Sequence, residues 1–260
     1  MVRMTSPLLH VPPATLRRAA PPLLFIHGAY VGAWCWQSRF LPWFAARGYD
    51  CYALDLPGHG SRDRAGLDRF GLDDYVSDII AAIATLPAPP VLIGHSLGGW
   101  LAQEVAERTA LPGLALLASV PPYGVAGSLA HMGLASPRLL LGLGRWSHHE
   151  LDLHGVRELL FSDGAEVAEL RRFAELVQAE SARALAELML PRPWRLWRAA
   201  PAQRCLVIGC DDDRLISRHD VELTAAHWRV APHFVSGGHA LMADVAWQQT
   251  AALIDRWLSS

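Results

Sequence analysis

Short apolar runs alternate with amphipathic segments over the first half of the chain. The run Leu23–Ile26 is followed at once by His27 and Gly28, as expected of a strand that is buried on both faces and closed by a turn. Aromatic residues between Val31 and Gly48 recur at intervals of three and four, which predicts an amphipathic helix. Further strands are expected at 49–54, 90–93 and 114–119, and further helices at 72–86 and 97–108. These repeated strand–helix units predict the α/β class, with a mostly parallel sheet between two helical layers.

The alternation stops after Pro121 and Pro122 and returns after residue 200. The segment 121–200 is rich in leucine and arginine at helical spacing, and we predict that it forms an inserted helical cap. Beyond it we expect a strand at 205–208, a helix at 219–228, a strand at 234–235 and a helix ending at Leu258. The predicted organisation is therefore a core made of 1–120 and 201–260, with the cap at 121–200.

The composition indicates a globular protein without a nucleic-acid-binding surface. Of its 260 residues, 52% are hydrophobic and 18% are charged, which is too apolar for a disordered chain. The net charge of −2 lacks the basic excess typical of nucleic-acid-binding proteins. All 23 basic residues are arginine, which excludes mechanisms that need a Schiff-base lysine or a phosphate-loop lysine.

Cysteine usage and the absence of long apolar segments suggest a compartment. Cys35, Cys51, Cys205 and Cys210 are scattered and lack CxxC spacing, so we interpret them as reduced packing residues. The first twenty residues contain no signal-peptide-like apolar run, and no stretch is long enough to span a membrane. We therefore expect a cytoplasmic protein with neither a membrane nor a nucleic acid as partner. The sequence leaves the oligomeric state open.

The clearest chemical signal is a pentapeptide between a predicted strand and a predicted helix. It reads Gly94-His95-Ser96-Leu97-Gly98, a G-x-S-x-G pattern in the context of a nucleophile turn. Such a turn lifts the serine oxygen clear of the sheet, and a side chain at either glycine would crowd it. Ser96 is the candidate nucleophile, and the alternative interpretation is an ordinary glycine-rich helix start.

A serine hydroxyl needs a base to take its proton, and the base needs a carboxylate to orient it. His239 follows the last predicted strand and is the candidate base. Asp211, Asp212 and Asp213 follow the strand before it, and we expect one of them to be the acid. A solvated acidic loop or a metal site is the alternative, although no local spacing supplies further metal ligands.

The loop after the first predicted strand supplies a candidate oxyanion hole. It begins His27-Gly28-Ala29, where a second backbone donor is needed beside the amide of Leu97. We expect Ala29 to be that donor, whereas a simple strand–helix turn would look similar if this motif stood alone.

These motifs resemble the α/β-hydrolase superfamily over nearly the whole chain. The opening loop, His27-Gly28-Ala29-Tyr30-Val31-Gly32-Ala33-Trp34-Cys35-Trp36, is similar to that of the plant methylesterase and hydroxynitrile lyase branch. The stretch 55–60, the Gly-His-Ser-Leu-Gly-Gly turn and Gly238-His239 resemble the common hydrolase pattern. The resemblance implies Ser96 as nucleophile, His239 as base, and the amides of Ala29 and Leu97 as the oxyanion hole.

The same resemblance favours Asp213 as the acid. Family members usually carry an aspartate followed by two residues, an aliphatic and often a proline, which Asp213-Arg214-Leu215-Ile216-Ser217 fits best. One extra residue after Gly209, relative to the commonest form, leaves Asp212 as the alternative.

The resemblance implies a cofactor-independent serine hydrolase, in the manner of a carboxylesterase, acting on an ester of small to medium size with apolar character. A carbon–carbon bond hydrolase or a lyase on the same triad is the first alternative, although the lysine of the hydroxynitrile lyases has no counterpart in a chain without lysine. A ligand sensor that keeps the triad without turnover is the second.

No metal site is expected. The sequence His148-His149-Glu150 with His154 resembles a zinc-binding helix, but the spacing from His149 to His154 is too long by one residue for both side chains to meet one ion.

Overall fold

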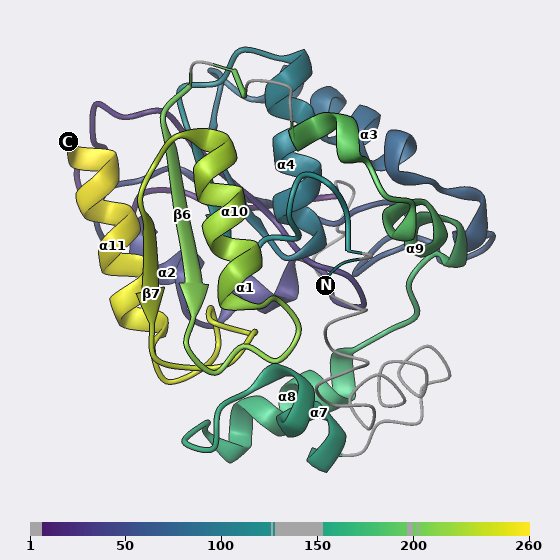
Figure 1. Ribbon diagram of the computed structural model, residues 1–260. Coiled ribbons are helices and arrows are strands. Elements are labelled where there is room, and N and C mark those ends of the chain that lie inside the picture. Colours follow the sequence, from purple (N-terminus) through teal and green to yellow (C-terminus); the bar gives the residue numbers. More distant parts are fainter. Residues whose placement is uncertain (1–6, 126, 128–152, 197–199, 202) are drawn as a thin grey trace.

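A seven-stranded sheet in the order β1-β3-β2-β4-β5-β6-β7 lies at the centre of the molecule (Figure 1). The computed structural model describes residues 7–125, 127, 153–196, 200–201 and 203–260. Within them the strands are β1 (Leu8–Val11), β2 (Leu23–Ile26), β3 (Cys51–Leu54), β4 (Val91–His95), β5 (Leu114–Leu117), β6 (Cys205–Cys210) and β7 (Pro232–Val235). Only β1 is antiparallel to its neighbour, so the predicted α/β class and mostly parallel sheet are confirmed.

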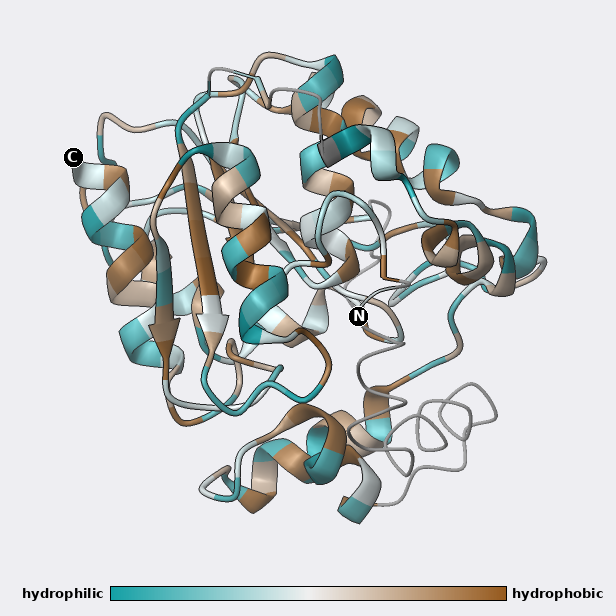
Figure 2. Cartoon of the chain, in the orientation of Figure 1, coloured by the Kyte–Doolittle hydropathy of each residue, from teal (hydrophilic) through white to brown (hydrophobic). Residues whose placement is uncertain are grey.

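Helices cover both faces of this sheet. One face carries α1 (Trp34–Gln37), α2 (Phe40–Ala45) and α11 (Trp247–Ser259), and the other carries α3 (Leu72–Thr85), α4 (Leu97–Arg108) and α10 (Arg218–Trp228). Side chains of β2 alternate between the two: Leu23 and Phe25 belong to the first apolar layer, and Leu24 and Ile26 to the second. The buried strand β6 is accordingly brown along most of its length in Figure 2, while α10 and α11 are banded brown and teal.

The continuous helix predicted for residues 31–48 is wrong, because the structure has two short helices, α1 and α2, in that range. A proline inside a continuous helix would remove a hydrogen bond, whereas Pro42 lies in the first turn of α2, where none is lost. The aromatic spacing instead reflects packing around Phe25, whose ring centroid lies 5.2 Å from that of Trp36 and 5.7 Å from that of Phe44.

Two elements of the core were not predicted. β1 is a short edge strand between prolines, and it pairs Leu8 with Leu54 at the outer side of β3. The 3₁₀ helix η1 (Leu67–Arg69) lies in the polar loop before α3. Both are short, and neither has the hydrophobic periodicity from which longer elements are predicted.

Four helical elements follow β5 in the described part of 121–200: α7 (Leu153–Leu160), α8 (Val167–Leu176), α9 (Ala182–Met189) and η2 (Pro193–Leu196). α7 and α8 lie beyond the carboxyl ends of β6 and β7, and α9 lies close to α3 (Figure 1). The division into core and cap stays a prediction. His148, His149 and Glu150 of the zinc-like sequence fall outside the described residues.

No helix in the described ranges has both the length and the apolar character needed to cross a membrane.

Candidate active site

Ser96 occupies the sharp turn between β4 and α4. β4 ends at His95 and α4 begins at Leu97, so Ser96 is the single residue between them. Its φ of +52° and ψ of −118° form a strained backbone conformation for a residue with a side chain. A side chain at Gly94 would collide with the carbonyl oxygen of Gly98, which explains the glycine. The structure thus has a strained strand–turn–helix junction where the sequence predicts a nucleophile turn.

The loop after β2 lies beside this turn because β2 and β4 are adjacent parallel strands. A Cβ atom placed on Gly28 would lie 3.1 Å from the Cβ atom of Ser96. Ala29 follows directly. Within the part of the chain that the structure describes, the amides of Ala29 and Leu97 donate to no acceptor. Both predicted oxyanion donors are therefore free to bind a ligand oxygen.

His239 and Asp213 form a buried pair. The Nδ1 atom of His239 lies 2.9 Å from Oδ2 of Asp213, and the two side chains are 3% and 1% exposed. Oδ1 of Asp213 accepts hydrogen bonds from the amides of Leu215 (2.8 Å) and Ile216 (2.9 Å). Because both carboxylate oxygens are held, Asp213 fixes the imidazole with its hydrogen on Nδ1, and no described residue forms a hydrogen bond with its Nε2.

The three consecutive aspartates differ in their surroundings. Asp211 and Asp212 are exposed, and Asp211 forms an ion pair of 3.3 Å with Arg218. Of the three, Asp213 is the one that the structure brings to His239. The geometry therefore favours Asp213 over Asp212 as the partner of the imidazole.

His95 connects the Ser96 turn to the loop that carries His239. Its Nε2 donates to the carbonyl oxygen of His239 at 2.9 Å, and the two ring centroids are 4.7 Å apart. Burial, and after it the neighbouring His239 ring, holds the pKa of His95 well below its ordinary value, so this donor is a neutral imidazole. Among the described residues no hydrogen bond joins the Ser96 hydroxyl to the His239 ring. Such contacts often tighten only when substrate binds.

Asp244, which the sequence motifs do not single out, holds the same loop from the other side. Its Oδ2 accepts from the amides of Gly238 (2.6 Å) and Ser162 (2.7 Å), and its Oδ1 accepts from the Ser162 hydroxyl (2.9 Å). The residue is 1% exposed. It therefore ties the loop after β7 to the segment after α7. Its partner Ser162 is distant in sequence, so no local pattern could have identified it.

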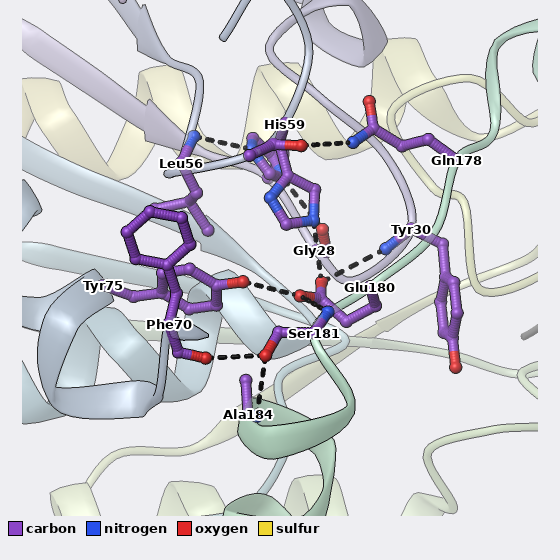
Figure 3. A network of polar contacts seen from close by, with 12 residues as sticks. Gly28, Tyr30, Leu56, His59, Phe70, Tyr75, Gln178, Glu180, Ser181 and Ala184 are labelled. Carbon is purple, nitrogen blue, oxygen red and sulfur yellow. Dashed lines mark hydrogen bonds and ion pairs between the residues drawn. The ribbon is translucent and has the colours of Figure 1, made fainter. Parts of the chain in front are cut away.

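Another buried carboxylate, Glu180, lies in a network of polar contacts with His59, Tyr30, Tyr75 and Ser181 (Figure 3). One of its oxygens lies 3.1 Å from Nε2 of His59 and 3.4 Å from the amide nitrogen of Tyr30. The other accepts from the Tyr75 hydroxyl and the Ser181 amide, both at 2.8 Å. Like Asp244, Glu180 could not be identified from a local pattern, because its partner His59 is distant in sequence.

The described residues contain no group of three or more His, Cys, Asp or Glu side chains that could hold a metal ion. The side chain of His154, one member of the zinc-like sequence, is 84% exposed, and its Nε2 lies 4.0 Å from Oε2 of Glu158.

Comparison with known proteins relates these features to one family. The sequence model of the alpha/beta hydrolase family matches residues 23–253, which includes Ser96, Asp213 and His239. The crystal structure of a methylesterase from Arabidopsis, MES16, superposes with a TM-score of 0.67 at 19% identity, covering 92% of this chain and 99% of the other. At that identity the likeness shows the fold.

Two curated relatives match a shorter stretch. A pyrethroid hydrolase of Sphingobium wenxiniae is 34% identical over 102 residues, which cover 38% of this chain and 35% of the relative. Esterase PIR7B of Oryza sativa subsp. japonica is 35% identical over 89 residues, which cover 33% of this chain and 32% of the relative. The chain thus spans about a third of the length of these relatives.

Proposed function

The chain belongs to the alpha/beta hydrolase family, and from this membership we propose that it is a serine esterase that cleaves a carboxylic ester of small to medium size. The observation that carries the proposal is the buried pair of His239 and Asp213 in a loop that His95 joins to the Ser96 turn. Relatives named as an esterase and a hydrolase support the same class of reaction.

In the proposed mechanism the Ser96 oxygen attacks the ester carbonyl carbon while Nε2 of His239 accepts the hydroxyl proton. Asp213 stabilises the imidazolium through Nδ1, and the amides of Ala29 and Leu97 bind the oxyanion. Collapse of the tetrahedral intermediate breaks the bond to the alcohol, which leaves with the proton from His239. Water then attacks the acyl-enzyme by the same route and releases the acid.

Apolar side chains of the helical segment between β5 and β6 support our proposal that the substrate has apolar character. Phe161 packs edge-on against Phe173, with ring centroids 5.0 Å apart, and Phe173 packs against Trp34 of the opening loop at 4.9 Å. Leu160 also accepts a hydrogen bond from the amide of Ala240, next to His239. An apolar group beside the loop that carries His239 suits an acyl or alcohol group of similar polarity.

We also place the enzyme in a reducing compartment, the cytoplasm, because all four cysteines are free and buried.

A panel of p-nitrophenyl esters from acetate to octanoate tests the proposal. The wild-type protein should turn over these esters with a preference for one chain length, and Ser96→Ala should reduce kcat by about 10⁴-fold or more while keeping the fold. Turnover retained in a purified Ser96→Ala protein would overturn the mechanism. Release of an aldehyde or cleavage of a carbon–carbon bond, with poor ester turnover, would replace the esterase assignment with a lyase or a carbon–carbon bond hydrolase.

A further inference from the structure

Glu180 and His59 form a fully buried ion pair that the proposed mechanism does not use. Nδ1 of His59 faces the carbonyl oxygen of Pro57 at 3.0 Å, and its Nε2 faces Glu180 at 3.1 Å. Both ring nitrogens therefore lie against hydrogen-bond acceptors, so His59 carries a hydrogen on each when Glu180 is ionised. Burial alone would lower the pKa of His59, but the hydrogen bond and the charge of Glu180 outweigh it and raise the pKa.

The same carboxylate reaches the backbone of the predicted oxyanion loop. Its Oε2 accepts from the amide of Tyr30 at 3.4 Å, and the amide of Gln178 donates to the carbonyl oxygen of Tyr30 at 2.8 Å (Figure 3 shows Glu180 between Tyr30 and His59). Residues 178–180 therefore bind both backbone polar groups of Tyr30, its N–H and its carbonyl oxygen. Tyr30 needs this support because its φ of +66° is a left-handed conformation that side-chain-bearing residues rarely adopt.

Gln178 fixes the neighbouring turn in parallel. Its side-chain amide donates to the carbonyl oxygen of Gly58 at 3.1 Å, and its side-chain oxygen accepts from the amide of Gly60 at 2.9 Å. These hydrogen bonds hold the turn that carries His59 against residues 178–180. Glu180 therefore contacts two positioned groups, the His59 ring and the Tyr30 amide.

We propose that Glu180 is a positioning residue for the oxyanion hole, acting through the backbone of Tyr30 on the neighbouring amide of Ala29. This inference rests on the proposed function, because it gives a role to an amide that the esterase mechanism assigns. Ala29 and Tyr30 are adjacent, so a rotation of the backbone at Tyr30 turns the chain at Ala29 as well. A carboxylate that holds Tyr30 in its strained conformation keeps the donor aimed at the carbonyl oxygen beside Ser96.

Glu180→Gln is the direct test, because the amide keeps the size of the side chain but has only one acceptor oxygen. Either the amide of Tyr30 or that of Ser181 then loses its acceptor. Ser181 is also held by the hydrogen bond from its hydroxyl to the carbonyl oxygen of Phe70, so we expect Tyr30 to be the residue that moves. For p-nitrophenyl acetate we expect kcat to fall by about 10- to 100-fold with KM changed less than about threefold. The Ki of phenylboronic acid, which forms a tetrahedral adduct on the serine, should rise by a similar factor.

Tyr75→Phe is the matched control. It removes the hydroxyl that donates to the other oxygen of Glu180 and leaves the contact with Tyr30 intact. We expect it to lower Tm but to change kcat far less than Glu180→Gln does. If the two variants lose kcat in proportion to their loss of Tm, the role of Glu180 is structural and the inference is wrong.

Two further outcomes separate this inference from the proposed function. A wild-type protein that neither hydrolyses esters nor binds phenylboronic acid would overturn the proposed function itself. A wild-type esterase whose Glu180→Gln variant keeps its kcat and its Ki would overturn only the positioning role. Should Glu180→Gln fail to fold, Glu180→Asp keeps a charge near His59 but withdraws the oxygen from Tyr30, and the same two readouts apply with the same expected directions.

Discussion

The imidazole of His239 donates from Nδ1 to the carboxylate of Asp213 at 2.9 Å, and solvent reaches almost none of either side chain. Water cannot compete for this hydrogen bond, so the ring has one tautomer and one orientation. The free nitrogen, Nε2, is the atom that the proposed mechanism needs as a base. This hydrogen bond, together with that from the amide of Asp212 to the carbonyl oxygen of Gly237, connects the loop after β6 with the loop after β7, and it is the basis of the first prediction.

Replacing the carboxylate that orients His239 should cost far more activity than replacing its exposed neighbour. Asp213→Asn should lower kcat by about 10⁴-fold, because an amide nitrogen facing Nδ1 favours the wrong tautomer. Asp212→Asn should stay within about twofold of the wild-type protein, because that side chain is exposed and does not contact His239. The measurement is kcat on one p-nitrophenyl ester. Equal losses in the two variants would show that the acid has been assigned wrongly.

Asp244 should contribute strongly to stability through the loop that carries His239. Asp244→Ala leaves the buried amide of Gly238 and both polar groups of Ser162 without their acceptor. The free energy of unfolding should fall by about 3 kcal/mol, as measured by urea denaturation. Ser162→Ala removes only the hydroxyl bond and should cost about 1 kcal/mol. A loss smaller than about 1 kcal/mol in Asp244→Ala would mean that contacts of other residues hold this loop.

Stability should fall as the pH decreases below 6.5 because two buried histidines stay neutral in the folded protein. Burial, together with the charge of His59, lowers the pKa of His27 to about 4, and burial lowers that of His95. Nε2 of His27 also accepts from the amide of Leu56, so it has no room for a proton. Below its ordinary pKa of 6.5 each ring gains a proton only on unfolding, and His27 alone should cost about 3 kcal/mol by pH 4. Urea denaturation against pH measures this loss, and a flat acid limb would contradict it.

His59 should make the stability of the folded protein fall as the pH rises above 6.5. Its pKa is raised in the folded protein, so its stabilisation is complete below the ordinary value of 6.5 and disappears as the pH rises through the raised value. Burial alone would raise the pKa of Glu180, but the hydrogen bond and charge of His59 outweigh burial and lower it in the folded protein. The contribution of Glu180 to stability is therefore lost only as the pH falls below its ordinary pKa of 4.5. His59→Gln should remove the alkaline fall in stability that the wild-type protein shows. An unchanged alkaline limb in the variant would rule out His59 as its source.

The four thiols should be unreactive in the native protein. Burial raises the pKa of Cys51 to about 12 and that of Cys35, Cys205 and Cys210 as well, so the thiolate that reacts is scarce. Ellman's reagent should therefore label none of them until denaturant is added, and iodoacetamide should leave ester turnover intact. Rapid inactivation by iodoacetamide would point to a cysteine near the site.

The parts of the fold that depend on local pattern could be predicted from the sequence. β2 is a continuous apolar run buried on both faces, and β4 begins with one that ends at Ile93. Ser96 stands in a motif whose first glycine is explained by a collision within the turn itself, whereas a side chain at Gly98 would collide with the carbonyl oxygens of Ile26 and His27 at the end of the adjacent β2. β1 could not be predicted, because its four residues, three of them half-buried and one exposed, become a strand only by pairing with β3.

The parts of the site that depend on tertiary pairing could not be predicted. The sequence offers three adjacent aspartates, and only the path of the loop after β6 shows which of them meets His239. Glu180 and Asp244 lie in no motif, because their partners His59 and Ser162 are far from them along the chain. Their roles follow from burial and hydrogen bonding, which no periodicity reveals.

Labelling with a fluorophosphonate, followed by peptide mass mapping, tests most directly whether Ser96 is an activated nucleophile. We expect a single adduct on the peptide that contains Ser96, which should be absent in Ser96→Ala and form much more slowly in Asp213→Asn, with ester turnover decreasing in step with labelling. An adduct on another residue, or no adduct on a folded wild-type protein, would contradict the proposal that Ser96, His239 and Asp213 act together.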